Sequence, residues 1–212
     1  MILVERIAVM NLENAVRGAR NPMNSWAKSD SYYDESGNYV LGENDLALAV
    51  RLRRAGSDHR KFLRQVFVSA DITAPLYWWK EFDTYKVSTV ANSTSTMHKL
   101  HSSPITAADF SCEKMRPETR RAFDAVVERL EALRQAFVET KDRAVWYDMI
   151  QFLPSSYNQM RTCTFNYENL INMYAARRFH KLDEWREFCA AVETLPYARE
   201  LILPEEPGPA GA

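Results

Sequence analysis

The sequence predicts a single α/β domain with more helix than strand, in which several helices flank a central sheet. Two stretches, residues 2–10 and 65–72, are rich in apolar and β-branched side chains and have the length of strands. Five longer stretches place apolar residues at helical spacing. Neither an internal repeat nor a linker divides residues 1–200, and a chain of 212 residues is long enough to bury one core.

The elements of the first half follow from apolar density and capping residues. Residues 2–10 are expected to form a strand whose apolar side chains are dense enough to be buried, and a polar loop follows at 28–42. A helix is expected over residues 43–56, with Asn44 or Asp45 near its N-terminal cap and a glycine at its end. The second strand follows this helix.

The second half of the chain is predicted to be mainly helical. The clearest helix covers residues 118–141, where apolar residues recur with the helical period. These residues are Phe123, Val126, Val127, Leu130, Leu133 and Phe137. Three more helices are expected over residues 142–154, 166–179 and 182–195. Asn166 is suited to cap the second of these three.

Composition argues against several classes of partner. The formal net charge is −1 and the basic residues are spread along the chain, whereas a nucleic-acid groove needs a concentrated basic face. No apolar run approaches the roughly 20 residues of a membrane span, and the N-terminal segment does not resemble a signal peptide. We therefore expect neither a nucleic-acid polymer nor a membrane as partner. A small anionic ligand remains open.

The three cysteines are too few and too scattered for a disulfide framework, which indicates a reducing, cytoplasmic setting. A nucleophilic role for Cys163 or Cys189 would need a neighbouring base, and both fall in stretches predicted to be helical or buried. Residues 201–212 are rich in proline and glycine and are expected to form a flexible tail.

Three residues invite a metal-site interpretation, because His98 and His101 are three apart and close to Cys112. The segment offers no second cysteine or carboxylate at matching spacing. Surface or hydrogen-bonding histidines are the favoured interpretation, and we expect no metal. The chain also lacks a glycine-rich loop of the kind that cradles phosphates.

Two features stay open when they are judged from local residues alone. The aromatic residues 77–85 are typical of packing, although aromatic side chains with polar tips also line sites for flat rings. Arg177 follows Asn166 and Asn172 in one predicted helix. It could complement the negative helix end, or it could present a planar fork to an amide or a phosphate.

Two longer blocks together resemble the flavin-dependent thymidylate synthase family. The first is "DLALAVRLRRAGSDHRKFLRQVFVSADITAP", residues 45–75, which is similar to a family helix ending in Gly-x-x-His, a turn, a strand and Ala-Pro. In this block His59 matches the flavin-site histidine, whereas Arg64 and Gln65 stand where the family has Glu-His. The resemblance covers roughly residues 19–195 in the family's order.

The second block is "LPSSYNQMRTCTFNYENLINMYAARR", residues 153–178. It matches the family pattern without gaps at Leu153, Pro154, Thr164, Asn166, Leu170, Asn172 and Arg177. The resemblance implies that Asn166 and Asn172 belong to the flavin site. It also implies that Arg177 contacts the uracil of dUMP and acts as the catalytic residue.

Residues 78–100 stand where the family has its arginine-rich signature. Hydroxyl groups are kept at both serine positions, Thr89 and Thr94, whereas the arginines that clamp phosphates are mostly replaced. The residues that fall on the other signature positions include Lys80, Glu81, Thr84, Tyr85, Lys86 and Thr96. By resemblance, Tyr85 and Lys86 fall on the cofactor side of the site. Those on the substrate side are Lys80, Glu81, Thr94, Thr96 and Arg177.

The resemblance implies an enzyme that methylates dUMP, or a related pyrimidine deoxynucleotide, to dTMP. The implied cofactor is FAD, the implied co-substrates are NADPH and methylenetetrahydrofolate, and the implied assembly is a homotetramer. The replaced arginines leave a second hypothesis open. On that hypothesis the chain is a non-catalytic nucleotide-binding or regulatory protein of the same fold that has lost flavin.

Overall fold

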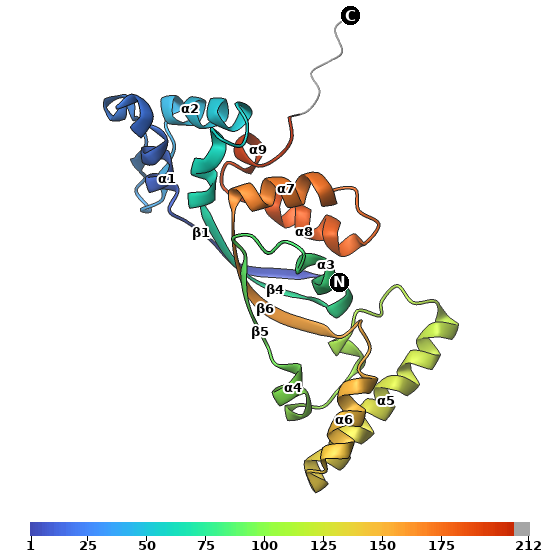
Figure 1. Ribbon diagram of the computed structural model, residues 1–212. Helices are drawn as coiled ribbons and strands as arrows, with labels where there is room; N and C mark the ends of the chain where they lie inside the picture. Colours follow the sequence, from blue (N-terminus) through green and yellow to red (C-terminus); the bar gives the residue numbers. More distant parts are fainter. Residues whose placement is uncertain (206–212) are drawn as a thin grey trace, which may run out of the picture. The chain divides into compact units, whose positions relative to one another are not determined.

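The structure, a computed structural model, describes residues 1–205 and has the predicted helix-rich α/β fold. Four strands form one sheet in the order β1-β4-β6-β5 (Figure 1). They are β1 (Leu3–Met10), β4 (Phe67–Pro75), β5 (Val90–Ser93) and β6 (Asn158–Asn166). A second sheet is the small antiparallel hairpin of β2 (Tyr32–Tyr33) and β3 (Tyr39–Val40).

Contacts within the chain divide it into two compact units. The first unit contains Met1–Glu5, Asp71–Tyr85 and Ala91–Thr162. The second unit contains residues 6–70, 86–90 and those from 163 on. The assignment of residues 1–200 to one domain stays a prediction, and the predicted tail lies outside the described residues from position 206 on.

The first unit holds a helical hairpin. Helix α5 (Pro117–Thr140) lies beside α6 (Arg143–Phe152) (Figure 1). Buried side chains of α5 belong to one hydrophobic core with Met149 of α6. Those side chains are Phe123, Val127, Leu130 and Leu133. Both helices were predicted. The structure adds that Asp142 caps α6, because its side chain accepts a hydrogen bond from the Ala144 backbone N–H. The short helix α4 (Thr96–Lys99) precedes them.

The aromatic residues that opened the 78–100 stretch form a packed cluster in helix α3 (Leu76–Phe82). The rings of Trp78 and Trp79 lie 4.9 Å apart, and the ring of Phe82 lies 5.2 Å from each of them. All three side chains are buried. For these three residues the structure supports packing rather than a flat-ring site.

The second unit contains α1 (Leu12–Ala19), α2 (Glu43–Arg54), α7 (Tyr167–Arg177), α8 (Asp183–Glu193) and α9 (Ala198–Leu201). A 3₁₀ helix, η3 (Arg60–Gln65), packs against α1, α2 and α7. Helices α7 and α8 lie side by side (Figure 1). Leu201 and Ile202 are buried, so the packed part of this unit extends beyond residue 200.

Two expectations for the first half of the chain were wrong. Strand β1 exists, but most of its side chains are exposed to solvent. Ile7, for example, is 39% exposed. Helix α2 is capped by Gly42 rather than by Asn44 or Asp45. The Asp30 carboxylate accepts hydrogen bonds from the backbone N–H groups of residues 44 and 45, which leaves no room for a side chain at Gly42.

Candidate functional site

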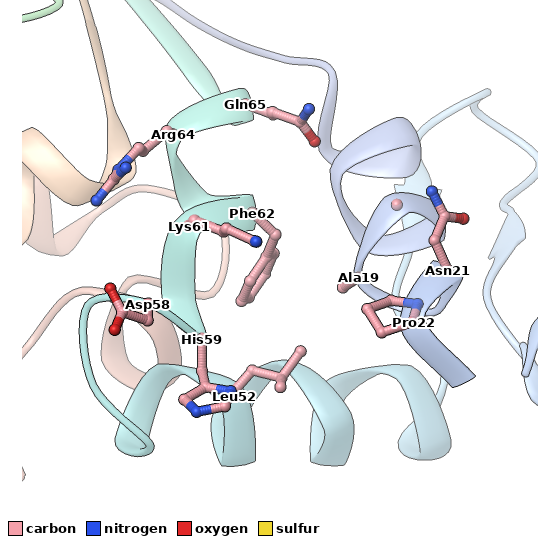
Figure 2. Close-up of a pocket in the computed structure, with 11 residues that line it drawn as sticks. Ala19, Asn21, Pro22, Leu52, Asp58, His59, Lys61, Phe62, Arg64 and Gln65 are labelled. Atoms are coloured by element: carbon pink, nitrogen blue, oxygen red, sulfur yellow. The ribbon is translucent and has the colours of Figure 1, made fainter. Parts of the chain in front are cut away.

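His59 lies on the rim of a pocket of about 650 Å³ in the second unit (Figure 2). The pocket is bordered by α1, by α2 and by η3. Its lining residues are Gly18, Ala19, Asn21, Pro22, Leu52, Asp58, His59, Lys61, Phe62, Arg64 and Gln65. We call this hollow the His59 pocket. Seven of its eleven lining residues belong to the first family-like block.

The floor and walls of the His59 pocket combine apolar and polar groups. Phe62 is buried and its ring points into the hollow, while Leu52 and Pro22 supply aliphatic surface (Figure 2). The amide of Gln65 reaches toward α1, where a Cβ added at Gly18 would lie 3.5 Å from its Oε1. Such a mixture of ring surface and a few polar groups is typical of small-molecule sites.

Arg64 lines the pocket but its side chain turns away from the centre (Figure 2). It forms an ion pair with Glu168 in the first turn of α7, and this hydrogen bond raises the pKa of Arg64. Arg60 pairs with the same carboxylate, with 3.3 Å between Nε and Oε1. Glu168 is buried, so both arginines tie η3 to α7.

Lys61 differs from Arg64 in being unpaired. Within residues 1–205 its ammonium group has no ion-pair or hydrogen-bond partner, and it points into the hollow (Figure 2). It is therefore the cation of the pocket lining that is free to meet an anionic ligand. Sequence reasoning missed Lys61 and Phe62, although both follow His59 directly in the first family-like block.

Asn166 caps α7, as predicted. Its side-chain oxygen accepts a hydrogen bond from the Asn169 backbone N–H at 2.9 Å. In return, the Asn169 side-chain oxygen accepts a hydrogen bond from the Asn166 backbone N–H at 3.1 Å. The Asn169 amide also donates to the carbonyl oxygen of Val87 at 2.9 Å. The segment that carries the exposed Lys86 is thereby held against the first turn of α7.

Arg177 lies in the last turn of α7, and its guanidinium stacks 4.6 Å from the ring centroid of Trp185 in α8. Asn172 is exposed on the same helix. A separation of five residues turns the two side chains about 140° apart around the axis, so they do not share one face. The Arg177 guanidinium thus makes a cation–π contact with the ring of a fully buried tryptophan.

The remaining predicted site residues belong to the first unit. Lys80 is exposed on α3, beside the half-buried Glu81, and Tyr85 follows that helix. Thr94 follows β5 and bonds through both its N–H and its hydroxyl to the Met160 carbonyl, at 2.9 and 3.2 Å. Thr96 is the first residue of α4.

Arg161 is a basic residue of the first unit that sequence reasoning missed. Its guanidinium lies 4.2 Å from the Trp79 ring centroid and donates to Asp83 Oδ1 at 2.8 Å. It directly follows Met160, to which Thr94 bonds. The nearest sequence signal is its place inside the second family-like block, three positions before the matched Thr164.

The cysteines are buried thiols, as the structural interpretation of Cys163 and Cys189 required. Burial and the nearby Glu193 carboxylate raise the pKa of Cys189 to about 11. Cys112 is buried too. His101 packs edge-on against Phe137, with 4.9 Å between the ring centroids. Within residues 1–205 no group of His, Cys, Asp and Glu side chains could hold a metal ion.

The arrangement of elements defines the class of fold. The chain has the fold of the flavin-dependent thymidylate synthases, as two solved structures of thymidylate synthase X from Helicobacter pylori with FAD and dUMP show. One superposes with a TM-score of 0.70 and 17% identity, over 95% of this chain and 96% of that chain. The other has a TM-score of 0.69 and 18% identity, over 95% and 97%.

A third solved structure with this fold is a UMP/dUMP methylase, PolB from Streptomyces cacaoi, bound with 5-Br dUMP. Its TM-score is 0.61 at 14% identity, over 94% of this chain and 91% of that chain. At such identities the likeness shows the fold. No protein-family model and no curated protein matches the sequence. In the described part of the chain, no helix is both long and apolar enough to cross a membrane.

Proposed function

We propose that this protein is a divergent flavin-dependent thymidylate synthase-like enzyme that methylates dUMP, or a related pyrimidine nucleotide. The observation that carries the proposal is the His59 pocket, where seven residues of the first family-like block, His59 among them, line one hollow. The fold supports the same conclusion, because the likeness extends over nearly the whole of both chains. Function rests on the site rather than on the fold alone.

The lining of the His59 pocket fits a flavin. Its volume of about 650 Å³ lies within the range of roughly 300–1,000 Å³ that is usual for ligand sites. Phe62, Leu52 and Pro22 offer surface to a flat ring, and His59, Gln65 and Asn21 offer hydrogen-bonding groups to its polar edge. When bound and reduced by NADPH, the flavin would supply a hydride for a carbon unit derived from methylenetetrahydrofolate.

Lys61 is the residue that we assign to the cofactor phosphates. It is a point charge without the bidentate geometry of arginine, so we expect weaker and less oriented phosphate binding than an arginine clamp provides. Arg64 does not compensate, because its side chain is paired with Glu168. From the resemblance alone, we assign further phosphate contacts to Lys80, Lys86 and Thr94, and we count Tyr85, Glu81 and Thr96 as further site residues.

Arg177 is proposed to bind the pyrimidine ring of the substrate. Trp185 holds its planar guanidinium in one orientation, which suits a fork that donates to a carbonyl oxygen. Such a preorganised donor stabilises the negative charge that develops on that oxygen during attack at the ring. Asn166 and Asn172 complete the proposed flavin site. For Asn166, capping α7 keeps the helix that carries Arg177 in place.

We include a cytoplasmic homotetramer in this proposal. Apolar side chains of β1 that are exposed in the single chain, among them Leu3 and Ile7, support assembly with further copies.

The test is turnover by the purified protein. We expect dTMP, detected by mass spectrometry, when dUMP is incubated with FAD, NADPH and methylenetetrahydrofolate, and none when FAD is left out. Arg177→Ala is expected to abolish the product. Absence of any methylated pyrimidine with the wild-type protein, under conditions where FAD and dUMP both bind, would reject the proposed activity.

A second function is favoured by the replaced arginines. Lys80, Tyr85, Lys86 and Thr96 stand at signature positions, and Lys61 is the unpaired cation of the described pocket lining. A nucleotide-binding or regulatory protein without flavin would have this composition. A colourless preparation that binds dUMP in a calorimeter and ignores added FAD would support this function over the enzyme.

A further inference from the structure

A second hollow lies on the other face of α1, in the same unit as the His59 pocket. Its volume is about 360 Å³, and it shares none of its lining residues with the His59 pocket. Its lining includes the side chains of Glu13, Arg17, Trp26, Tyr32, Tyr33 and Tyr39. We call it the tyrosine pocket. The proposed function does not use it.

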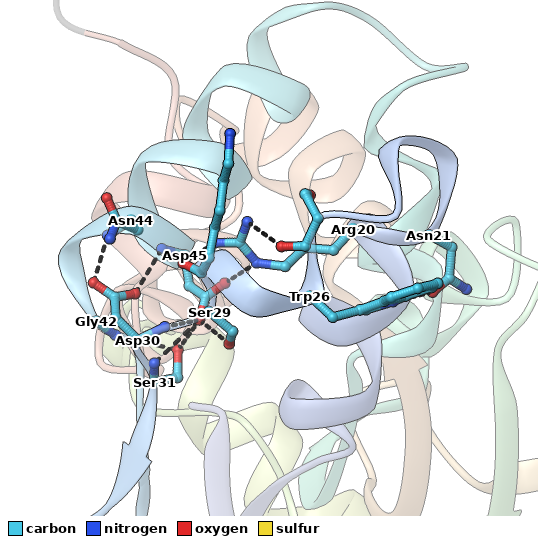
Figure 3. A network of polar contacts seen from close by, with 11 residues as sticks. Arg20, Asn21, Trp26, Ser29, Asp30, Ser31, Gly42, Asn44 and Asp45 are labelled. Atoms are coloured by element: carbon cyan, nitrogen blue, oxygen red, sulfur yellow. Dashed lines mark hydrogen bonds and ion pairs between the residues drawn. The ribbon is translucent and has the colours of Figure 1, made fainter.

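The wall of the tyrosine pocket is held by a buried ion pair (Figure 3). Arg20 Nε lies 2.6 Å from Asp45 Oδ1, and the two side chains are 5% and 0% exposed. Asp45 Oδ2 accepts hydrogen bonds from the hydroxyls of Ser29 and Ser31, at 2.7 and 2.6 Å. Backbone N–H groups of residues 30 and 31 donate to the same oxygen. This network fixes the loop that precedes the hairpin.

The aromatic side chains of the pocket are exposed although the loop that carries them is anchored. Trp26, Tyr32 and Tyr33 are 45%, 57% and 58% exposed. The Trp26 indole donates to Asn21 Oδ1 at 2.9 Å, and the rings of Tyr33 and Tyr39 meet edge-on at 5.4 Å. Rings that are held in place but not buried present ready faces for another flat ring.

The charges of the pocket leave one cation free. Arg20 is neutralised by Asp45, and Glu13 accepts a hydrogen bond of 2.6 Å from the Tyr33 hydroxyl. Arg17 is exposed, and its guanidinium has no ion-pair or hydrogen-bond partner within residues 1–205. Arginine offers a planar fork that matches a phosphate. Ring faces and a free guanidinium together suit a flat heterocycle that carries a phosphate.

We propose that the tyrosine pocket binds a mononucleotide, with its base against the Trp26 and tyrosine rings and its phosphate at Arg17. The volume of about 360 Å³ is near the lower end of the usual range for ligand sites, which suits a mononucleotide better than a dinucleotide. The hydrogen bond from Trp26 to Asn21 links this site to the His59 pocket, since Asn21 lines the latter.

The test follows tryptophan emission and heat during titration of the full-length protein. The probes are the adenine and guanine ribonucleoside 5′-monophosphates, because pyrimidine nucleotides would also occupy the substrate site proposed at Arg177. Each is titrated separately, with inorganic phosphate and the two nucleosides as further titrants. Arg17→Gln should weaken binding about tenfold or more, as expected for a charge-assisted contact. Trp26→Phe should keep binding but lose the emission change. Lys61→Gln, which changes the lining of the His59 pocket, should alter neither the nucleotide affinity nor the emission change.

Several results would overturn the site. They are the absence of binding by every nucleotide, inorganic phosphate binding as tightly as a nucleotide, and an affinity that Arg17→Gln leaves unchanged. Loss of the emission change in Lys61→Gln, with Arg17→Gln unaffected, would put the ligand in the His59 pocket instead. Arg17 is exposed and unpaired, so its variant is expected to fold, which circular dichroism verifies. Failure of flavin binding or of dTMP formation does not bear on this site.

Discussion

Arg64 of η3 and Glu168 of α7, which are 104 residues apart in the chain, form an ion pair in which the glutamate is buried. The pair gives a structural reason for the departure from the family pattern at position 64. An arginine there does not add charge to the His59 pocket but joins η3, which carries the pocket's Lys61 and Phe62, to the helix that carries Arg177.

Glu168→Gln is expected to lower the free energy of unfolding by about 1–2 kcal/mol, because it leaves two partly exposed arginines without their shared carboxylate. Urea denaturation at neutral pH measures the change. The matched control is Asp124→Asn, which removes an exposed pair with Arg120 and should cost about 0.5 kcal/mol or less. Equal losses in the two variants would show that Glu168 has no special role.

Asp45→Asn should be more damaging, by about 3–5 kcal/mol, since Arg20 would stay buried without its counter-charge. Burial raises the pKa of Asp45, but hydrogen bonds from Ser31 and Ser29 and the Arg20 pair outweigh it and leave the pKa below its usual value. Arg17→Gln, at an exposed position of α1, should change the free energy of unfolding by no more than about 0.5 kcal/mol. A comparable loss of stability in Asp45→Asn and Arg17→Gln would contradict the stabilising role of the buried network.

Acid should weaken the first unit through Glu131. Its hydrogen bond with Arg134 lowers the pKa of Glu131 from 4.5 to about 2. A lowered folded-state pKa gives stability that is fully present above pH 4.5 and is lost as the pH falls toward 2. Unfolding curves of wild type and Glu131→Gln should therefore differ at neutral pH and converge in acid. A difference that does not change with pH would contradict this account.

Arg177→Ala is expected to weaken dUMP binding about tenfold to a hundredfold and to leave FAD bound, because the lost fork meets the substrate ring. Arg177→Lys should recover little of the loss, since lysine has no planar fork to stack on Trp185. Calorimetry with dUMP and a parallel FAD titration give both values. Loss of FAD at unchanged dUMP affinity would refute the assigned role.

The native thiols should resist a thiol reagent until the chain unfolds. All three cysteines are buried, and the raised pKa of Cys189 leaves almost no thiolate at neutral pH. The measurement counts thiols that react with and without denaturant, and Cys189→Ser should retain any dTMP formation. Fast reaction of a native cysteine would contradict the structural interpretation.

Local signals explain which parts of the fold could be predicted. Helix α5 and the Asn166 cap of α7 depend on residues within a few positions of each other, and both were predicted. Helix α3 was not, because its Trp78, Trp79 and Phe82 cluster shows no clear helical period over seven residues. The exposure of β1 could not be read from its apolar density, since burial depends on what packs against a strand.

In the candidate site, too, features that depend on neighbouring residues could be predicted, and features that depend on residues far apart in the chain could not. His59 could be found from its motif, but Lys61 emerged as the free cation only once Arg64 proved to be paired with a residue of α7. The tyrosine pocket depends on Asp45 reaching back to Arg20, a contact over 25 residues that no local pattern announces. Pairings across such distances in sequence need the folded chain.

FAD affinity at the His59 pocket tests the central claim most directly. In a titration followed by flavin fluorescence, we expect the wild-type protein to bind FAD and Lys61→Gln to bind it about tenfold more weakly. Lys99→Gln, an exposed lysine of the other unit, should match the wild type. Failure of the wild type to bind FAD, or equal binding by Lys61→Gln and wild type, would contradict the account.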